Sequence, residues 1–248
     1  MCLQNNFQQD YNTDYCILWY ILTIFIKHNK KLCDIYNFPI VNILGTIDDK
    51  IENNERKISD LEQIAINKII NTDSFKEITL QEIAKITMGQ SPDGSSLNYK
   101  NGTIFYQGRT DFGLRYPNIR TYSTNPTRFA NTYDILLSVR APVGDINISL
   151  TDCAIGRGLS SIRSEKYQNL LYYILKLNKN KFNVYNGEGT VFGSIDKKSL
   201  HNFKINFPNN CENLENICKI VNIKCKNLHY QNLKLENLKQ IYLKKFFG

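Results

Sequence analysis

Hydrophobic residues recur at alternating steps of three and four positions from Leu44 to Lys68, and charged or amide side chains fill the steps between them. The positions of this stripe are Leu44, Ile47, Ile51, Asn54, Ile58, Leu61 and Ala65. Such spacing puts the stripe along one side of a helix and is typical of a helix that packs lengthwise against another. We therefore predict a long helix from about Pro39 to Ile70, ended by the turn-forming residues that follow it.

The same stripe returns near the C-terminus, 177 residues further along (238 − 61 = 177). Leu61-Glu-Gln-Ile64 has its counterpart in Leu238-Lys-Gln-Ile241. The positions of the second stripe are Val221, Leu228, Gln231, Leu235, Leu238 and Tyr242. Gln231 thus stands where the first copy has Asn54, and a polar residue in a seam either fixes the register of two packed helices or faces solvent where the seam frays. The repeat predicts two related long helices that bracket residues 72–210.

The stretch between these helices alternates apolar β-branched or aromatic runs with Gly, Pro and Asn, which is typical of short strands joined by turns. The predicted strands are Thr103–Gln107, Ile135–Val139, Ile146–Leu150, Leu159–Ile162 and Phe203–Phe207. A helix is predicted from Tyr167 to Lys176, and the capping-box pattern Thr79-Leu-Gln-Glu82 predicts a shorter helix through Ile86. The expected fold class is α+β, a β-rich globular domain between two long helices.

The first 38 residues resemble the end of that β-rich domain. Leu18-Trp-Tyr-Ile-Leu22 is similar to Leu171-Tyr-Tyr-Ile-Leu175, and Asn37-Phe-Pro39 to Asn206-Phe-Pro208. The apolar run from Tyr15 to Ile26 is shorter than the roughly 20 residues that cross a membrane, so we expect a buried helix there. The chain then divides into a remnant of a first domain (1–38), a first long helix (39–71), a complete domain (72–210) and a second long helix (211–248).

Charge and cysteine content narrow the class of protein. The chain has 31 basic and 23 acidic side chains, a net charge of +8 that favours a polyanionic partner. Seven cysteines, an odd number without a Cys-x-x-Cys pair, indicate reduced thiols in the cytoplasm. Cys211, Cys218 and Cys225 recur every seven residues, so on a helix they share a face, and we interpret them as small packing residues. We expect no metal and no cofactor.

Motifs for catalysis are missing from the sequence. There is no Gly-x-x-x-x-Gly-Lys phosphate loop, no Asn/Asp-Pro-Pro-Tyr/Phe run of an amino-methyltransferase and no Gly-x-Ser-x-Gly nucleophile turn. We therefore expect a protein that is not itself an enzyme. A nuclease with unrecognised carboxylates is the alternative, and it would cleave DNA by itself with a metal ion.

Cations and amides gather in the loops of the β-rich domain. The candidate DNA-binding residues are Gln107, Arg109, Arg115, Arg120, Arg128, Arg140, Arg157, Lys179 and Lys181. Arginine matches guanine edges and phosphate oxygens, glutamine can read adenine, and lysine suits phosphates. Several of these cations could instead pair with carboxylates such as Asp111, Asp134 and Asp145. The pattern predicts a DNA-binding surface to which only some of these residues contribute.

The chain resembles the specificity (S) subunits of type I restriction-modification systems, in a half-length form with one complete target recognition domain. The resemblance rests on Gly89-Gln-Ser-Pro92, on Asp134–Gly144, on Gly189–Ile195 followed by Phe207-Pro208, and on the repeated helix. It implies that the two helices are spacer regions that pack as an antiparallel coiled coil. It also implies a sequence-specific DNA-binding subunit that directs methyltransferase (modification) and endonuclease (restriction) subunits to a bipartite target.

The half-length form leaves more than one reading open. Two copies could pair as a homodimer, or one chain could pair with another half-subunit, so that two domains read a split site. The chain could instead be a truncated or cassette product without independent DNA reading. A pure protein-interaction scaffold is the rival from a different class, and the salt dependence of DNA binding would distinguish it.

Overall fold

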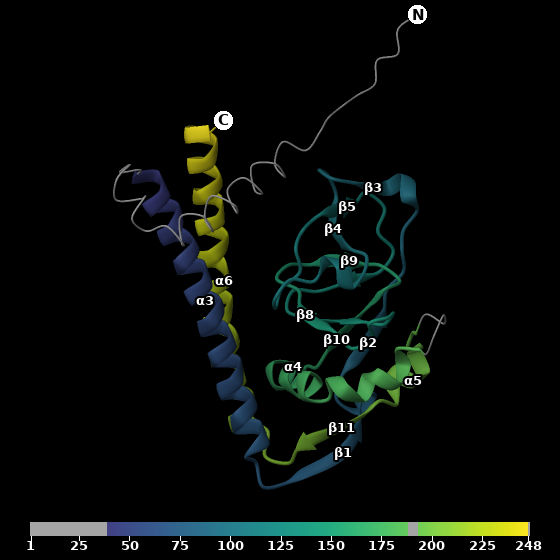
Figure 1. Ribbon diagram of the computed structural model, residues 1–248. Helices are drawn as coiled ribbons and strands as arrows, with labels where there is room; N and C mark the ends of the chain where they lie inside the picture. Colours follow the sequence, from purple (N-terminus) through teal and green to yellow (C-terminus); the bar gives the residue numbers. More distant parts are fainter. Residues whose placement is uncertain (1–38, 188–192, 248) are drawn as a thin grey trace, which may run out of the picture. The chain divides into compact units, whose positions relative to one another are not determined.

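The computed structural model describes residues 39–187 and 193–247, with two long helices and a β-rich domain (Figure 1). The helices are α3 (Pro39–Ile70) and α6 (Glu212–Phe247). The expected remnant at residues 1–38, its helix from Tyr15 to Ile26 and the motif residues 189–192 lie outside the described residues. The described residues form two compact units, 39–58 with 226–247 and 59–187 with 193–225.

In the first unit, α3 and α6 run antiparallel. Lys239 Nζ donates to Asp48 Oδ1 at 2.7 Å, and Asn54 Nδ2 donates to Asn232 Oδ1 at 2.7 Å. Residue numbers therefore rise along α3, from Asp48 to Asn54, while those of their partners on α6 fall from Lys239 to Asn232. Leu44 and Ile47 are buried along this contact. The expected antiparallel packing is confirmed.

The predicted stripe on α6 is partly wrong. Val221 is buried and Leu228, Leu235 and Tyr242 are half-buried, but Gln231 is exposed and Leu238 is 40% exposed. The neighbouring positions Cys225 and Asn232 are buried instead. From Val221 onward, the buried positions of α6 are therefore separated by four and then three residues. The prediction carries over the α3 spacing, in which the steps are three and then four. Both choices keep the seven-residue period, so the period alone did not separate Gln231 from Asn232.

The Asn54–Asn232 hydrogen bond is a buried polar contact inside an apolar seam, with Asn54 fully buried. Replacing Asn54 alone with leucine leaves the Asn232 amide without its partner, so we expect the free energy of unfolding to fall by about 1–3 kcal/mol. The double variant Asn54→Leu/Asn232→Leu should regain that stability. Urea denaturation followed by circular dichroism measures both. A double variant as unstable as the sum of the two single variants would contradict this reading.

The β-rich domain contains two larger sheets and a two-stranded ribbon. The order in the five-stranded sheet is β3 (Leu97–Asn98), β5 (Thr121–Ser123), β4 (Thr103–Tyr106), β9 (Cys153–Ile155) and β6 (Phe129–Ala130). The order in the four-stranded sheet is β2 (Lys85–Met88), β10 (Leu159–Arg163), β7 (Ile135–Ser138) and β8 (Ile146–Ile148). The ribbon pairs β1 (Phe75–Thr79) with β11 (Lys204–Pro208). The α+β fold class is confirmed.

Most of the predicted elements are present, but the helix expected from Thr79 to Ile86 is wrong. The capping box exists, because Thr79 N donates to Glu82 Oε1 at 2.6 Å, yet it opens only the 3₁₀ turn η1 (Leu80–Glu82). The following residues form β2, in which Ile86 pairs with Ile162 and is buried. Burial of an apolar side chain in the sheet outweighs the short helix that the cap favours.

Helix α4 (Gln168–Leu177) fills the core beside the sheets, and its residues 170–175 are buried. It leads into the 3₁₀ segment η4 (Lys179–Tyr185), whose Phe182 ring stacks on Phe203 at 3.9 Å between centroids. The short helix α5 (Lys197–His201) precedes β11. The chain therefore enters the domain through β1 and leaves through β11, two hydrogen-bonded neighbours in which Phe75 pairs with Pro208.

Cys211, which directly precedes α6, and Cys218 and Cys225 within α6 pack as the sequence indicated. Cys211, Cys218 and Cys225 are free thiols and all three are buried. Burial raises the pKa of Cys218 to about 12, so this thiol stays protonated and unreactive at neutral pH.

Within residues 39–187 and 193–247, no cluster of three or more His, Cys, Asp or Glu side chains is placed to hold a metal ion.

Candidate nucleic-acid interface

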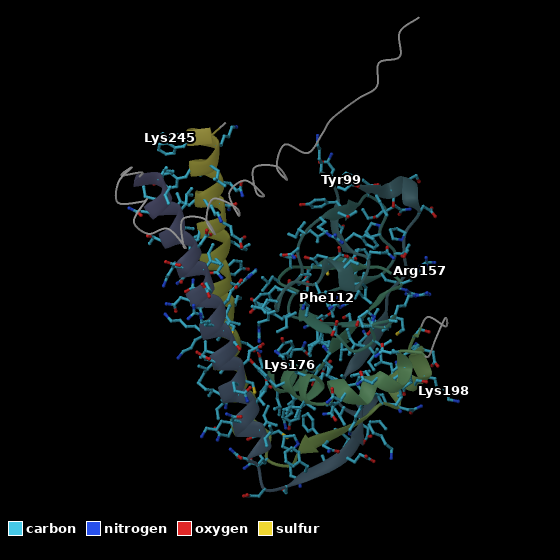
Figure 2. All side chains as sticks on the ribbon, viewed as in Figure 1. Tyr99, Phe112, Arg157, Lys176, Lys198 and Lys245 are labelled. Carbon is cyan, nitrogen blue, oxygen red and sulfur yellow. The ribbon has the colours of Figure 1, made fainter. Side chains whose placement is uncertain are left out.

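Loops that are distant in sequence meet around residues 156–158. Gly89 N donates to Leu159 O at 2.9 Å, Gly156 N donates to Tyr106 O at 2.8 Å, and Val139 N donates to Gly158 O at 2.9 Å. We call this meeting of residues 89–91, 107–109, 127–128, 139–140 and 156–158 the loop cluster. Arg157 extends from it at the edge of the β-rich domain (Figure 2). These backbone hydrogen bonds join the loops to one another.

Glycines allow this close approach of backbones. A Cβ atom on Gly89 would lie 2.2 Å from Gly156 O, and one on Gly158 would lie 2.7 Å from Gln107 O. No side chain fits at such distances, because the neighbouring atoms belong to backbone that cannot move aside. The glycine of the Gly89-Gln-Ser-Pro92 motif therefore has a packing role beneath the loop cluster.

Five of the predicted DNA-binding residues lie in the loop cluster: Gln107, Arg109, Arg128, Arg140 and Arg157. All five are exposed, and the side chain of Arg109 is 56% exposed. Within the described residues no ion pair involves Arg128, Arg140 or Arg157. Three guanidinium groups are thus available on one set of loops.

Ser91 orients the polar groups at the centre of the loop cluster. Gln107 Nε2 donates to Ser91 Oγ at 2.9 Å, and Arg157 N donates to the same oxygen at 3.3 Å. The Gln107 amide is therefore held in a fixed plane beside the Arg157 backbone. This role could not be predicted from the sequence, since serine in a Gly-Gln-Ser-Pro loop is most simply a turn residue.

Asp111 holds the 107–109 turn from below and binds Arg120. Its Oδ2 accepts from Gln107 N at 2.7 Å and from Gly108 N at 3.3 Å, while its Oδ1 accepts from Arg120 Nε at 2.9 Å. Asp111 is buried, whereas the side chain of Arg120 is 55% exposed. Arg120 is therefore a tethered cation at the surface. The alternative that some cations pair with carboxylates holds here.

Arg109 and Lys179 share one carboxylate, that of Asp145. Arg109 forms an ion pair with Asp145 Oδ2, and Lys179 Nζ lies 2.6 Å from Asp145 Oδ1. Partial burial raises the pKa of Asp145, but hydrogen bonds from Lys179 and Arg109 outweigh it and hold the pKa below its ordinary value. Lys181 is exposed elsewhere on η4, where its Nζ donates to Lys204 O at 3.3 Å.

The prediction that Arg115 binds DNA is wrong, because its side chain is only 1% exposed. Arg115 forms an ion pair with Glu62 of α3 and donates to Asn222 Oδ1 of α6. Its guanidinium also lies 4.4 Å from the centroid of the Tyr172 ring of α4. Arg115 therefore joins its loop to three helices of the second unit, and because its side chain is buried it cannot reach a ligand outside.

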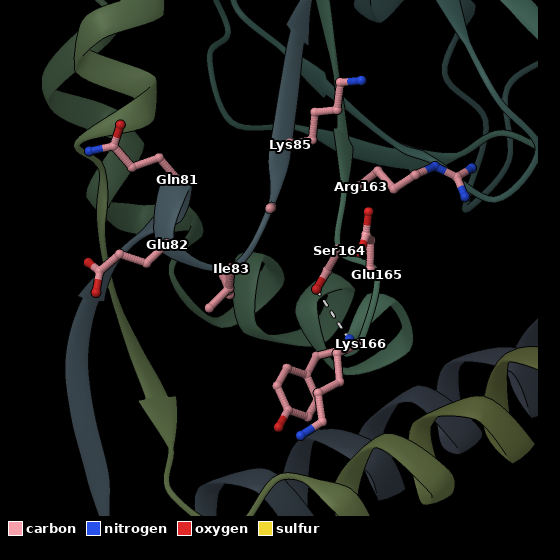
Figure 3. Close-up of a pocket in the computed structure, with 10 residues that line it drawn as sticks. Gln81, Glu82, Ile83, Lys85, Arg163, Ser164, Glu165 and Lys166 are labelled. Carbon is pink, nitrogen blue, oxygen red and sulfur yellow. Dashed lines mark hydrogen bonds between the residues drawn. The ribbon is translucent and has the colours of Figure 1, made fainter.

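A pocket lies between residues 81–85 and 163–167, away from the loop cluster (Figure 3). Its lining mixes Glu82 and Glu165 with Lys85 and Lys166, and Arg163 is already paired with Asp134 at 2.5 Å. Acidic and basic side chains line this pocket in similar numbers, so it does not favour an anionic ligand. It therefore does not extend the DNA-binding surface proposed for the loop cluster.

In the part of the chain that is described, no helix is both long and apolar enough to cross a membrane.

Comparison with known proteins places these features in a family. Residues 72–240 match the family model described as type I restriction modification DNA specificity domain. The putative type I restriction enzyme MjaX specificity subunit of Methanocaldococcus jannaschii is 39% identical over 202 residues, which cover 74% of this chain and 47% of that protein. The chain thus spans about half the length of this curated relative.

Solved structures agree with the match. The HsdS subunit from Thermoanaerobacter tengcongensis is similar with a TM-score of 0.53 and 27% identity, over 84% of this chain and 56% of that one. The type I restriction-modification S subunit from M. genitalium has a TM-score of 0.63 at 16% identity, over 85% and 60% of the two chains, and shares the fold alone.

Proposed function

The chain belongs to the family of type I restriction-modification DNA specificity subunits, and from that membership we propose that it is a non-catalytic, sequence-specific DNA-binding subunit. It directs modification and restriction subunits to a bipartite target in the cytoplasm. The β-rich domain over residues 72–210 is the target recognition domain, and the two long helices are the spacer that the partner subunits bind.

The observation that carries this proposal is the loop cluster. Its Arg128, Arg140 and Arg157 are exposed, and they stand beside the oriented amide of Gln107. An arginine fork donates two hydrogen bonds to guanine, and a glutamine amide pairs with adenine through a donor and an acceptor. Rigid backbone beneath such side chains limits what they can contact, which supports reading of bases as well as binding of phosphates.

Apolar side chains exposed on α6 support the proposal that partner subunits bind the long helices. Ile220 is 56% exposed, Ile223 is 46% exposed and Ile241 is 63% exposed. Isoleucines exposed along a helix are suited to burial against another protein. This feature also fits the rival reading of a pure interaction scaffold, in which the loop cluster would bind no DNA.

The described residues contain one β-rich domain, whereas the proposed target has two parts. We propose that the second domain comes from another copy of the chain or from a different half-subunit. Light scattering with and without the modification subunit checks this assembly. A monomer at micromolar concentration under both conditions would overturn pairing of copies and favour the truncated or cassette product.

Arg157→Ala and Arg140→Ala are expected to weaken binding to the recognised duplex by about 1–3 kcal/mol each if a base contact is lost. The duplex would be selected from a random pool with the modification subunit present, and affinity measured by fluorescence anisotropy. Arg56→Ala is the matched control, because Arg56 is an exposed arginine on α3 that pairs with Glu52. Equal affinity of all three variants would refute the loop cluster as the DNA-reading surface.

A salt titration separates this proposal from the scaffold. A protein that contacts several phosphates loses affinity steeply with salt, with a log–log slope of about −0.9 for each phosphate. Binding of duplex DNA that is absent, or insensitive to salt, would favour the scaffold.

A further inference from the structure

A small cavity opens beside Arg109, between the loops at residues 112–114 and 144–147 and helix α4. Its volume is about 260 Å³. The polar and glycine residues that line it are Arg109, Gly113, Gly144, Asp145, Asn147, Lys176 and Lys179. We call it the cation notch. Tyr172 also lines the notch, and its hydroxyl donates to Glu62 Oε1 at 3.2 Å, so the buried Arg115–Glu62 contact lies directly behind the notch.

Positive charge exceeds negative charge around the cation notch. Asp145 pairs with both Arg109 and Lys179, and Glu62 pairs with both Arg115 and Lys176. Four cations therefore share two carboxylates, which leaves an excess of +2 (4 − 2 = 2). Cations in a partly buried site are costly unless anions balance them, and the site is favourable for a further anion.

Lys176 shows the effect of this excess. Burial, together with the nearby charge of Arg115, lowers the pKa of Lys176 to about 8. An added anion in the notch would relieve that repulsion. Glycines at residues 113 and 144 contribute no side chain to the walls, and the Asn147 amide is occupied, since Nδ2 donates to Gly113 O at 3.2 Å and Oδ1 accepts from Gly113 N at 3.1 Å.

The notch adjoins the loop cluster. Arg109 belongs to both, and the position of a Cβ on the preceding Gly108 is 3.9 Å from Gly158 Cα. Duplex DNA on the loop cluster would therefore bring its backbone next to Arg109 and Lys179, whose side chains are 56% and 57% exposed. Asp145 keeps the two cations together while no anion is present.

We propose that the cation notch binds one backbone phosphate of the DNA through Arg109 and Lys179, an inference that rests on the proposed DNA-binding function. The contact is independent of sequence, because phosphates are the same in every base pair. It sets the register of the duplex against the side chains that read bases.

Lys179→Gln is the test, with Lys204→Gln as the matched control. Both lysines are exposed and ion-paired, Lys179 with Asp145 at 2.6 Å and Lys204 with Glu77 at 2.7 Å. Each full-length variant is titrated with a 30-base-pair duplex of mixed sequence at a series of KCl concentrations. Loss of one phosphate contact lowers the magnitude of the slope of log affinity against log salt by about 0.9 in Lys179→Gln. Lys204→Gln keeps the wild-type slope.

Every other result of the salt titration overturns either the phosphate site or the proposed function. A wild-type slope in Lys179→Gln, or equal losses in both variants, overturns the notch as a phosphate site while DNA binding itself stands. No binding of the duplex by the wild-type chain at any salt concentration overturns the proposed function as well. Calorimetric binding of ADP that disappears in Lys179→Gln, with an unchanged DNA slope, would assign the notch to a free nucleotide phosphate instead.

Discussion

Arg115→Met is expected to lower the free energy of unfolding by about 3–5 kcal/mol, as removal of one partner from a buried ion pair does. Arg115 is the largest of the fully buried side chains in the described part of the chain, and it donates to Glu62, Asn222 and the Tyr173 hydroxyl. Methionine keeps much of the volume but offers none of these three acceptors a donor. Urea denaturation followed by circular dichroism measures the loss.

Arg56→Met is the matched control for Arg115. Arg56 pairs with Glu52 one helical turn away, with side chains 71% and 55% exposed. An exposed pair of this kind contributes about 0.3–0.5 kcal/mol. Should Arg115→Met cost as little as Arg56→Met, the buried contacts between the Arg115 loop and the helices would not stabilise the fold.

The double variant Arg115→Met/Glu62→Leu adds a second measurement. Glu62 lies between Arg115 and Lys176 and pairs with both. The stability losses of the two single variants, Arg115→Met and Glu62→Leu, are therefore expected to add up to more than the loss measured for the double variant. Additive losses would mean that the pair is not coupled.

Gly89→Ala is expected to destabilise the chain by about 3 kcal/mol, the upper range for overpacked sites. The new methyl group would lie 2.2 Å from Gly156 O and 2.8 Å from Leu159 O. Both atoms are backbone, and Gly89 N must stay near Leu159 O to keep its 2.9 Å hydrogen bond. The loops must therefore separate, and we expect DNA binding to weaken with stability.

Gly94→Ala is the control, since a Cβ on Gly94 meets no atom within 4 Å. It lies in the same connection, in the 3₁₀ turn η2 (Gly94–Ser96), and its stability should change by no more than about 0.5 kcal/mol. Thermal unfolding of both variants checks the pair. Similar melting temperatures for Gly89→Ala and the wild type would show that the loops adapt, and the packing role of Gly89 would be refuted.

The long helices could be predicted because their period is local and repeats over many turns. The first helix begins and ends at Pro39 and Ile70, as the stripe indicated. Strands of two or three residues, such as β3 and β6, were not predicted, because they carry too few residues for alternation to be visible. Their pairing is set by partners far away in the chain.

The candidate site divides in the same way. The sequence identified the arginine-bearing loops but not which arginine faces inward. Arg115 and Arg157 look alike as loop cations, and what separates them is Glu62, 53 residues before Arg115. Asp145 was foreseen as a partner of a cation, but its sharing between Arg109 and Lys179 needs the three-dimensional fold.

The β1–β11 ribbon has a consequence for how such chains change over time and in the laboratory. The residues that open and close the recognition domain, Phe75 and Pro208, are cross-strand partners, and such partners lie about 5 Å apart. A replacement domain needs only two adjacent antiparallel strand ends to join the same helices, whatever its interior. Given the proposed function, we expect that crossing over at these two residues would graft a new DNA specificity onto an unchanged helical frame.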